Sequence, residues 1–230
     1  MSMMVNSCRF GSVLSAFPQV AGFVPTAFAM ATESHLVSMP ASVPAGALLR
    51  TALQVQANSL TTISTPSGWT LLWGTDDIDA PFRFGSFVKV AAGDEGGTSV
   101  NFVTSSATSG AAHCHMITNW YGSLPGVAAG GPNQFNSNNT VTVPNLSPGW
   151  GAGNTLWIIE GGARDDDGTV IVFPEGYSGL TTVSGGGFNA GASVFSAFQD
   201  LNAASVGSGV VGLSEAEAWI CNRIAIREAA

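Results

Sequence analysis

Apolar and polar residues alternate along residues 49–56 and again along residues 82–90. Successive side chains of a β-strand point to opposite faces, so this period of two predicts two strands, each with one apolar face. Short runs of β-branched and other apolar residues predict further strands at residues 100–103, 141–143, 157–159 and 170–173. Clusters of Gly, Pro, Asn and Asp separate these runs at intervals of roughly ten residues, which is typical of an all-β sandwich or barrel.

The C-terminal segment fits two patterns. Ser214 to Glu217 matches a helix capping box, and Ile220 and Ile224 lie four residues apart, as on one face of a helix. The same isoleucines also fit the period of two of a strand. An internal repeat of the chain equates this segment with residues 112–119, which favours the strand.

Motifs of the first half of the chain recur in the second half in the same order. The matches are Pro40 and Pro44 with Pro144 and Pro148, Ala45-Gly46 with Ala152-Gly153, residues 66–70 with 174–178, and residues 85–88 with 191–194. We therefore predict an all-β, jelly-roll-like β-sandwich built from two related halves, residues 35–123 and 140–230. A neutral Gly/Asn-rich linker at residues 124–139 joins them. Whether the halves form one sandwich or two packed domains stays open.

Residues 1–34 precede the repeat and are predicted to form an extended apolar N-terminal arm. The stretch from Phe10 to Thr32 carries no charged residue, and residues 27–29 resemble a signal-peptide cleavage site. Pro18 and Pro25 interrupt this run, which argues against a signal peptide and against a membrane span. We expect the arm to pack on its own domain or on a neighbour, and we predict that it anchors the protein to a neighbouring chain or to the shell. A chain that begins at Ser34 should keep its fold. The anchoring side chains would be Phe10, Leu14, Phe17, Phe23 and Phe28.

Composition and charge exclude several classes of protein. The chain is 45% hydrophobic and 10% charged, which excludes intrinsic disorder and a coiled coil. Its 7 Lys+Arg against 15 Asp+Glu give a net charge of −8, which argues against a nucleic-acid partner. The 3 cysteines show no CxxC motif and suggest reduced thiols. No charged residue occurs from Gly96 to Ile159, so this stretch forms either a neutral Ser/Thr-rich surface or a surface covered by a partner.

His113-Cys114-His115 is the most suggestive chemical motif. On a strand, His113 and His115 would share one face and could begin a zinc or nickel site. Such a site needs a third and fourth ligand, and the one further histidine, His35, lies in another region. We therefore expect two partly buried histidines and no metal.

The other motifs point to no cofactor and no enzyme. The acidic turns at residues 76–79 and 164–168 lack the alternate spacing of a calcium loop. Gly207 to Gly212 matches the dinucleotide-binding glycine pattern, but too few residues follow it for a βαβ unit. Trp69 follows a turn and fits a core aromatic. The candidates for exposed aromatics that stack on glycans are Trp120, Tyr121 and Trp150.

A series of turn and strand motifs spans residues 34–123. It comprises residues 34–40, 43–49, 65–72, 87–91 and 93–96, a strand at 98–104, and residues 111–122. This series resembles virion proteins of tailed bacteriophages and prophages. Its motifs are structural and identify no active site. Ala47 stands where that group commonly has Asp, which weakens a loop-capping role at this position.

The resemblance implies a β-sandwich on the outside of a phage particle, synthesised in the bacterial cytoplasm. We expect a non-enzymatic virion structural protein, specifically a capsid-decoration (cement) protein that stabilises the head. Its partners would be other copies of itself, with a trimer the first expectation, and phage capsid or tail proteins, but neither nucleic acid nor a membrane. The alternative is a tail-fibre or baseplate component that binds host surface glycans, and a polysaccharide-degrading enzyme ranks third.

Overall fold

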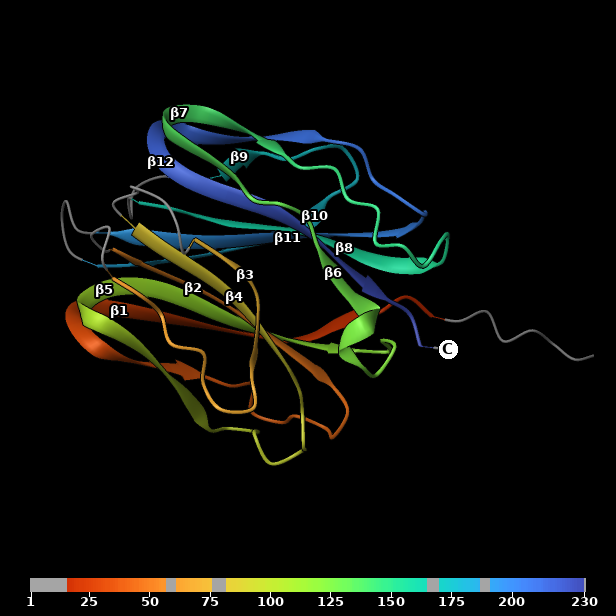
Figure 1. The fold of residues 1–230 in the computed structure, drawn as a ribbon, viewed down its shortest axis with the longest axis horizontal. Helices are drawn as coiled ribbons and strands as arrows, with labels where there is room; N and C mark the ends of the chain where they lie inside the picture. The colour runs from red at the N-terminus through yellow and green to blue at the C-terminus, as the bar shows by residue number, and fades with distance from the viewer. Residues whose placement is uncertain (1–15, 57–60, 76–81, 165–169, 187–190, 230) are drawn as a thin grey trace, which may run out of the picture.

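The structure is a computed structural model that describes residues 16–56, 61–75, 82–164, 170–186 and 191–229. Apart from one 3-10 turn at Leu124–Gly126, the regular elements of these residues are β-strands. They form two antiparallel sheets that stack face to face (Figure 1). The predicted all-β sandwich is therefore confirmed. The C-terminal segment is a strand, as the repeat indicated.

Each sheet consists of one half of the chain. The first sheet has the order β1-β5-β2-β4-β3, with β1 at Gln19–Ser38, β2 at Leu48–Gln56, β3 at Thr70–Gly74, β4 at Phe82–Val90 and β5 at Ser99–Thr118. The second has the order β10-β11-β8-β12-β6, and β7 and β9 also pair with β12. Its strands are β6 at Val127–Ala129, β7 at Asn133–Val143, β8 at Asn154–Ala163, β9 at Val170–Val172, β10 at Ser178–Gly185, β11 at Ala192–Asn202 and β12 at Gly209–Arg227.

The two halves share their strand order. β7, β8, β10, β11 and β12 take the places of β1, β2, β3, β4 and β5. The irregularities also correspond: the β1–β5 ladder shifts register next to the pair Ser34–Val103, and the β7–β12 ladder shifts next to the pair Thr140–Gly212. The sandwich is thus built from two related halves. The chain completes one sheet before it begins the other, which is simpler than the two Greek keys of a jelly roll.

The boundaries expected from the sequence fall inside strands. Position 34 lies within β1, which pairs with β5 along most of its length and so belongs to the first sheet. The segment expected to be a linker, residues 124–139, contains β6 and the first part of β7, both paired with β12. The arm and the linker are therefore structural parts of the two sheets from Gln19 onward.

The main core lies between the sheets. Both halves contribute to it, for example through Leu48 and Ile117 of the first sheet and Ile158 and Ile224 of the second. A smaller core covers the outer face of each sheet. Trp69 lies in the outer core of the first sheet, as predicted.

β1 and β10 are edge strands on the same side of the sandwich. They approach so closely that a Cβ atom on Gly185 of β10 would lie 2.9 Å from the nitrogen of Phe28 of β1, and only 2.1 Å from the carbonyl oxygen of Gly110 in the neighbouring β5. Only glycine fits at this crossing.

Candidate functional site

A cluster of polar side chains crosses the space between the two sheets. Arg50 of β2 forms an ion pair with Glu160 of β8, and both side chains are fully buried. Its Nη2 also donates to Nδ1 of His115 at 2.9 Å and to Oγ of Ser196 at 2.8 Å. Ser196 Oγ lies 3.0 Å from Nε2 of His113. The cluster joins β2 and β5 of one half to β8 and β11 of the other.

Both histidines of this cluster are neutral. Nδ1 of His115 accepts from Arg50, which places its proton on Nε2, next to the hydroxyl of Thr181 at 3.5 Å. Burial, followed by the neighbouring His113 and Arg50, holds the pKa of His115 well below its usual range. Burial and Arg50 do the same to the pKa of His113. A buried guanidinium beside two imidazoles opposes their protonation.

The cluster is closed to solvent. His113, His115, Arg50 and Glu160 are all fully buried. The ring of Phe23 covers the histidines from β1, with centroids 5.1 Å from His115 and 5.9 Å from His113. A substrate has no access to these groups in this conformation, so the cluster serves to hold the two sheets in register.

His113 and His115 share one face, as the sequence indicated, but they are fully rather than partly buried. Among the described residues, no group of three or more His, Cys, Asp and Glu side chains gathers in a way that could hold a metal ion. The cysteines Cys114 and Cys221 are buried free thiols, and burial raises their pKa values to about 11 and about 12. Thiols with such raised pKa values are unreactive.

The remaining motifs fall into two groups. Residues 76–79 of the first acidic turn and residues 165–168 of the second lie outside the described residues. The glycine motif, in contrast, lies within the described residues. Its last four residues, 209–212, form the start of β12 and pair with β7. This glycine-rich stretch is therefore a strand.

The three aromatic residues proposed to stack on glycans lie in different settings. Trp120 is only 5% exposed and its Nε1 donates to the carbonyl oxygen of Gly46, so it is a core residue rather than the exposed aromatic we predicted. Trp150 is half-buried against a small core at one end of the second sheet. Tyr121 is exposed, with the guanidinium carbon of Arg227 4.9 Å from its ring centroid. Of the three candidates, only Tyr121 is exposed.

The five arm residues are likewise divided. Phe10 and Leu14 lie outside the described residues, and Phe17 is half-buried just before β1. Phe23 packs on the histidines, and the ring of Phe28 lies edge-on to His35 at 4.8 Å. Phe23 and Phe28 therefore contact their own chain, because β1 is a strand of the first sheet.

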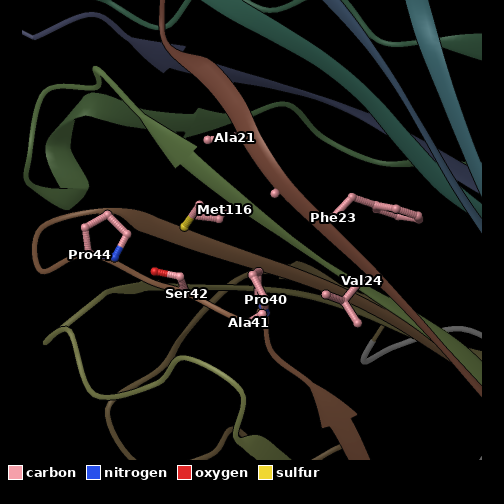
Figure 2. Close-up of a pocket in the computed structure, with 9 residues that line it drawn as sticks. Ala21, Phe23, Val24, Pro40, Ala41, Ser42, Pro44 and Met116 are labelled. Carbon is pink, nitrogen blue, oxygen red and sulfur yellow. The ribbon is translucent and has the colours of Figure 1, made fainter.

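The free edge of β1 borders an open groove of about 500 Å³. Figure 2 shows Phe23 and Val24 of β1 on one side and Pro44 on the other, with Met116 of β5 and Pro40 between them. Ala21, Gly22, Ala41 and Ser42 complete the lining. Among these residues the hydroxyl of Ser42 is the one polar side-chain group. This edge groove is the candidate functional surface, and its shape and chemistry suit an apolar segment of a polypeptide.

Sequence reasoning missed Arg50, Glu160 and Ser196 as members of one cluster. Their signal is weak: Arg50 interrupts an apolar run in β2, and Glu160 follows one in β8. Nothing in the sequence shows that these two positions face each other across the sandwich.

The chain matches no protein-family model, no curated protein and no solved structure. The described residues contain no helix with the length and apolar character needed to cross a membrane.

Proposed function

We propose that the protein is a non-enzymatic structural protein of a tailed-bacteriophage particle, a capsid-decoration protein that stabilises the head. The observation that carries the proposal is the edge strand β1, most of which is uncharged. From Gln19 to Thr32 it has no charged side chain, and it leaves Met30 81% exposed. A long apolar edge strand is a template for pairing with other chains, and monomeric proteins usually protect such edges with charge.

Two further features support an assembled protein. The neutral stretch from Gly96 to Ile159 includes exposed loop residues at 121–123, 145, 147, 149, 151 and 152, where a free-standing protein commonly places charge. The sequence resemblance over residues 34–123 adds the context of a phage particle. Each copy would bury neutral surface against shell subunits and against its sisters, and binding only the assembled state would stabilise that state.

The test uses phage particles assembled without this protein. Added wild-type protein should bind their heads to a saturable copy number and raise the temperature at which the heads release DNA. Ala27→Lys with Ala29→Lys, at exposed positions on β1, should lower the occupancy at least tenfold. Ala216→Lys, an exposed alanine of β12 in the other sheet, is the matched control and should bind normally.

Binding to tails instead of heads would overturn the decoration role. Binding to host surface polysaccharide, abolished by Tyr121→Ala, would favour the glycan-binding alternative. Circular dichroism of each variant shows whether the β-structure is retained.

A further inference from the structure

The edge groove lies beside a short length of β1 whose outer edge pairs with no other strand among the described residues. Its lining includes consecutive residues 21–24 of β1, so it opens onto the free edge of that strand as well as onto its face. The opposite wall, residues 40–44, is the loop that follows β1. A polypeptide segment in this groove could add to the sheet at β1 and place alternate side chains against Met116 and Pro40. Strand addition of this kind combines backbone hydrogen bonds with apolar pockets.

Pro25 limits the length of the added strand. Proline has no N–H to donate, and within a sheet it is tolerated where its nitrogen faces away from the neighbouring strand. Pro25 pairs with His113 of β5, so its nitrogen faces the free edge. The unpaired edge beside the groove therefore runs from Gln19 to Val24. Six residues of strand, about 20 Å long, fit there.

We propose that the groove receives the segment before β1, residues 5–15, from a second copy of this chain. This segment contains Val5, Phe10, Val13 and Leu14, and Arg9 is its one charged residue. Apolar side chains separated by small polar ones match a groove of Ala, Pro, Phe and Met. Fifteen extended residues span about 50 Å, which is enough to reach a neighbouring molecule.

The local sequence favours a second copy over the chain's own segment. To place residues 10–15, which include Phe10 and Leu14, in its own groove, the chain would have to reverse direction within Ala16, Phe17 and Pro18. Tight reversals between antiparallel strands require residues that adopt positive φ, chiefly Gly, Asn and Asp. None of these three residues is of that kind, and Pro18 is buried. Exchange between copies fills every groove in a closed assembly.

This inference deepens the proposed assembly role and rests on it, but it is tested on the purified full-length protein without particles. Phe10→Asp with Leu14→Asp removes the inserted segment's apolar side chains, and Ala41→Glu places a charge in the groove at an exposed position. Ser7→Asp with Ser15→Asp, and Ala216→Glu, are the matched controls. The molar mass in solution is measured by sedimentation for each variant alone and for mixtures.

The wild-type protein and both controls should assemble, and each test variant alone should associate at least tenfold more weakly. An equimolar mixture of the two test variants should form a one-to-one complex, because the segment of one fits the intact groove of the other. A monomeric wild-type protein, a mixture that stays monomeric, or a segment variant that still assembles by itself would each overturn the inference. If the copies exchange their N-terminal segments but the protein does not bind particles, the proposed function is wrong and the proposed exchange is still supported.

Discussion

The buried ion pair between Arg50 and Glu160 is the most consequential contact of single residues. Moving two charges out of water costs several kcal/mol, which is recovered only where geometry and further hydrogen bonds are good. Here Trp73 Nε1 donates to Oε1 of Glu160 at 2.6 Å, and His115 and Ser196 accept from Arg50. The carboxylate comes from one sheet and the guanidinium from the other. The pair therefore specifies how the sheets stack more than it adds stability.

Arg50→Met should lower the free energy of unfolding by about 3–5 kcal/mol, because it leaves Glu160 buried without its partner. The double variant Arg50→Met with Glu160→Leu should recover part of that loss, since no charge stays unpaired. Urea unfolding followed by tryptophan fluorescence measures both. A loss of less than 1 kcal/mol in the single variant would show that the pair is not buried in solution.

His35 is the second residue whose effect can be measured, through the pH dependence of the free energy of unfolding. It is fully buried, with Nε2 at 3.2 Å and 3.1 Å from the hydroxyls of Thr104 and Thr108. Burial lowers its pKa to about 4. The folded state thus binds a proton less tightly than the unfolded state, in which the pKa is about 6.5. The stabilisation is complete above pH 6.5 and is lost as the pH falls towards 4.

The free energy of unfolding should consequently decrease between pH 6.5 and pH 4, by up to about 3 kcal/mol for His35 alone. His113 and His115 act in the same direction. Glu95 contributes only at the acidic end of this window, because its pKa is lowered to about 2 and its effect begins near pH 4.5. Urea unfolding of the wild type and of His35→Gln at several pH values tests this. The variant should show a shallower slope, and equal slopes would contradict the assignment.

Individual strands show what the sequence could and could not predict. The alternation along 49–56 correctly predicts β2, but it suggests that Arg50 and Gln54 face water. Both are fully buried, because the polar face of β2 points at the other sheet and the apolar face is covered by an outer core. A period-two pattern shows that the two faces of a strand differ in polarity. It does not show whether water, the other sheet or an outer core covers each face. The edge groove could not be predicted from the sequence either, because β1, the loop at residues 40–44 and Met116 of β5 form it together.

β1 shows the same limit. An uncharged, mainly apolar run shows no clear period of two in the sequence, so the sequence predicts an arm outside the domain. Its pairing with β5 reverses the expectation that a chain beginning at Ser34 keeps its fold. That truncation removes the strand that covers His113 and His115. β1 is recognised as a strand by its pairing with β5, and β5 is distant from it in the sequence.

A chain that begins at Ser34 should therefore be destabilised by several kcal/mol and should aggregate, because it exposes the apolar side of β5. A chain that begins at Ala16, which retains all of β1, is the matched control and should remain folded. Circular dichroism and thermal melting compare the two. Identical melting temperatures would show that residues 16–33 do not stabilise the first sheet and form an arm, as the sequence predicted.

At the scale of the whole molecule, the two related halves form one sandwich. The main core contains residues of both sheets, and the polar cluster has its cation in one half and its carboxylate in the other. Trp120, which follows the first sheet, forms a β-bridge with Glu228 at the end of the second. Either half alone would leave its inner face uncovered. The other half covers it within the same chain, and the polar residues of the two inner faces are complementary, as Arg50 and Glu160 show.

Fragments that divide the chain between Gly122 and Ser123 should each fail to fold alone, because this cut separates the sheets and exposes the whole main core. Residues 1–122 retain β1 to β5, and residues 123–230 retain β6 to β12. Mixed at equal concentration, they should recover the β-sheet circular dichroism and a cooperative melting transition. The mixture with Arg50→Met in the first fragment is the specificity control, and it should recover at least tenfold less complex, since Glu160 of the second fragment then lacks its cation. A fragment that melts cooperatively by itself would show that the halves are independent domains that merely pack together.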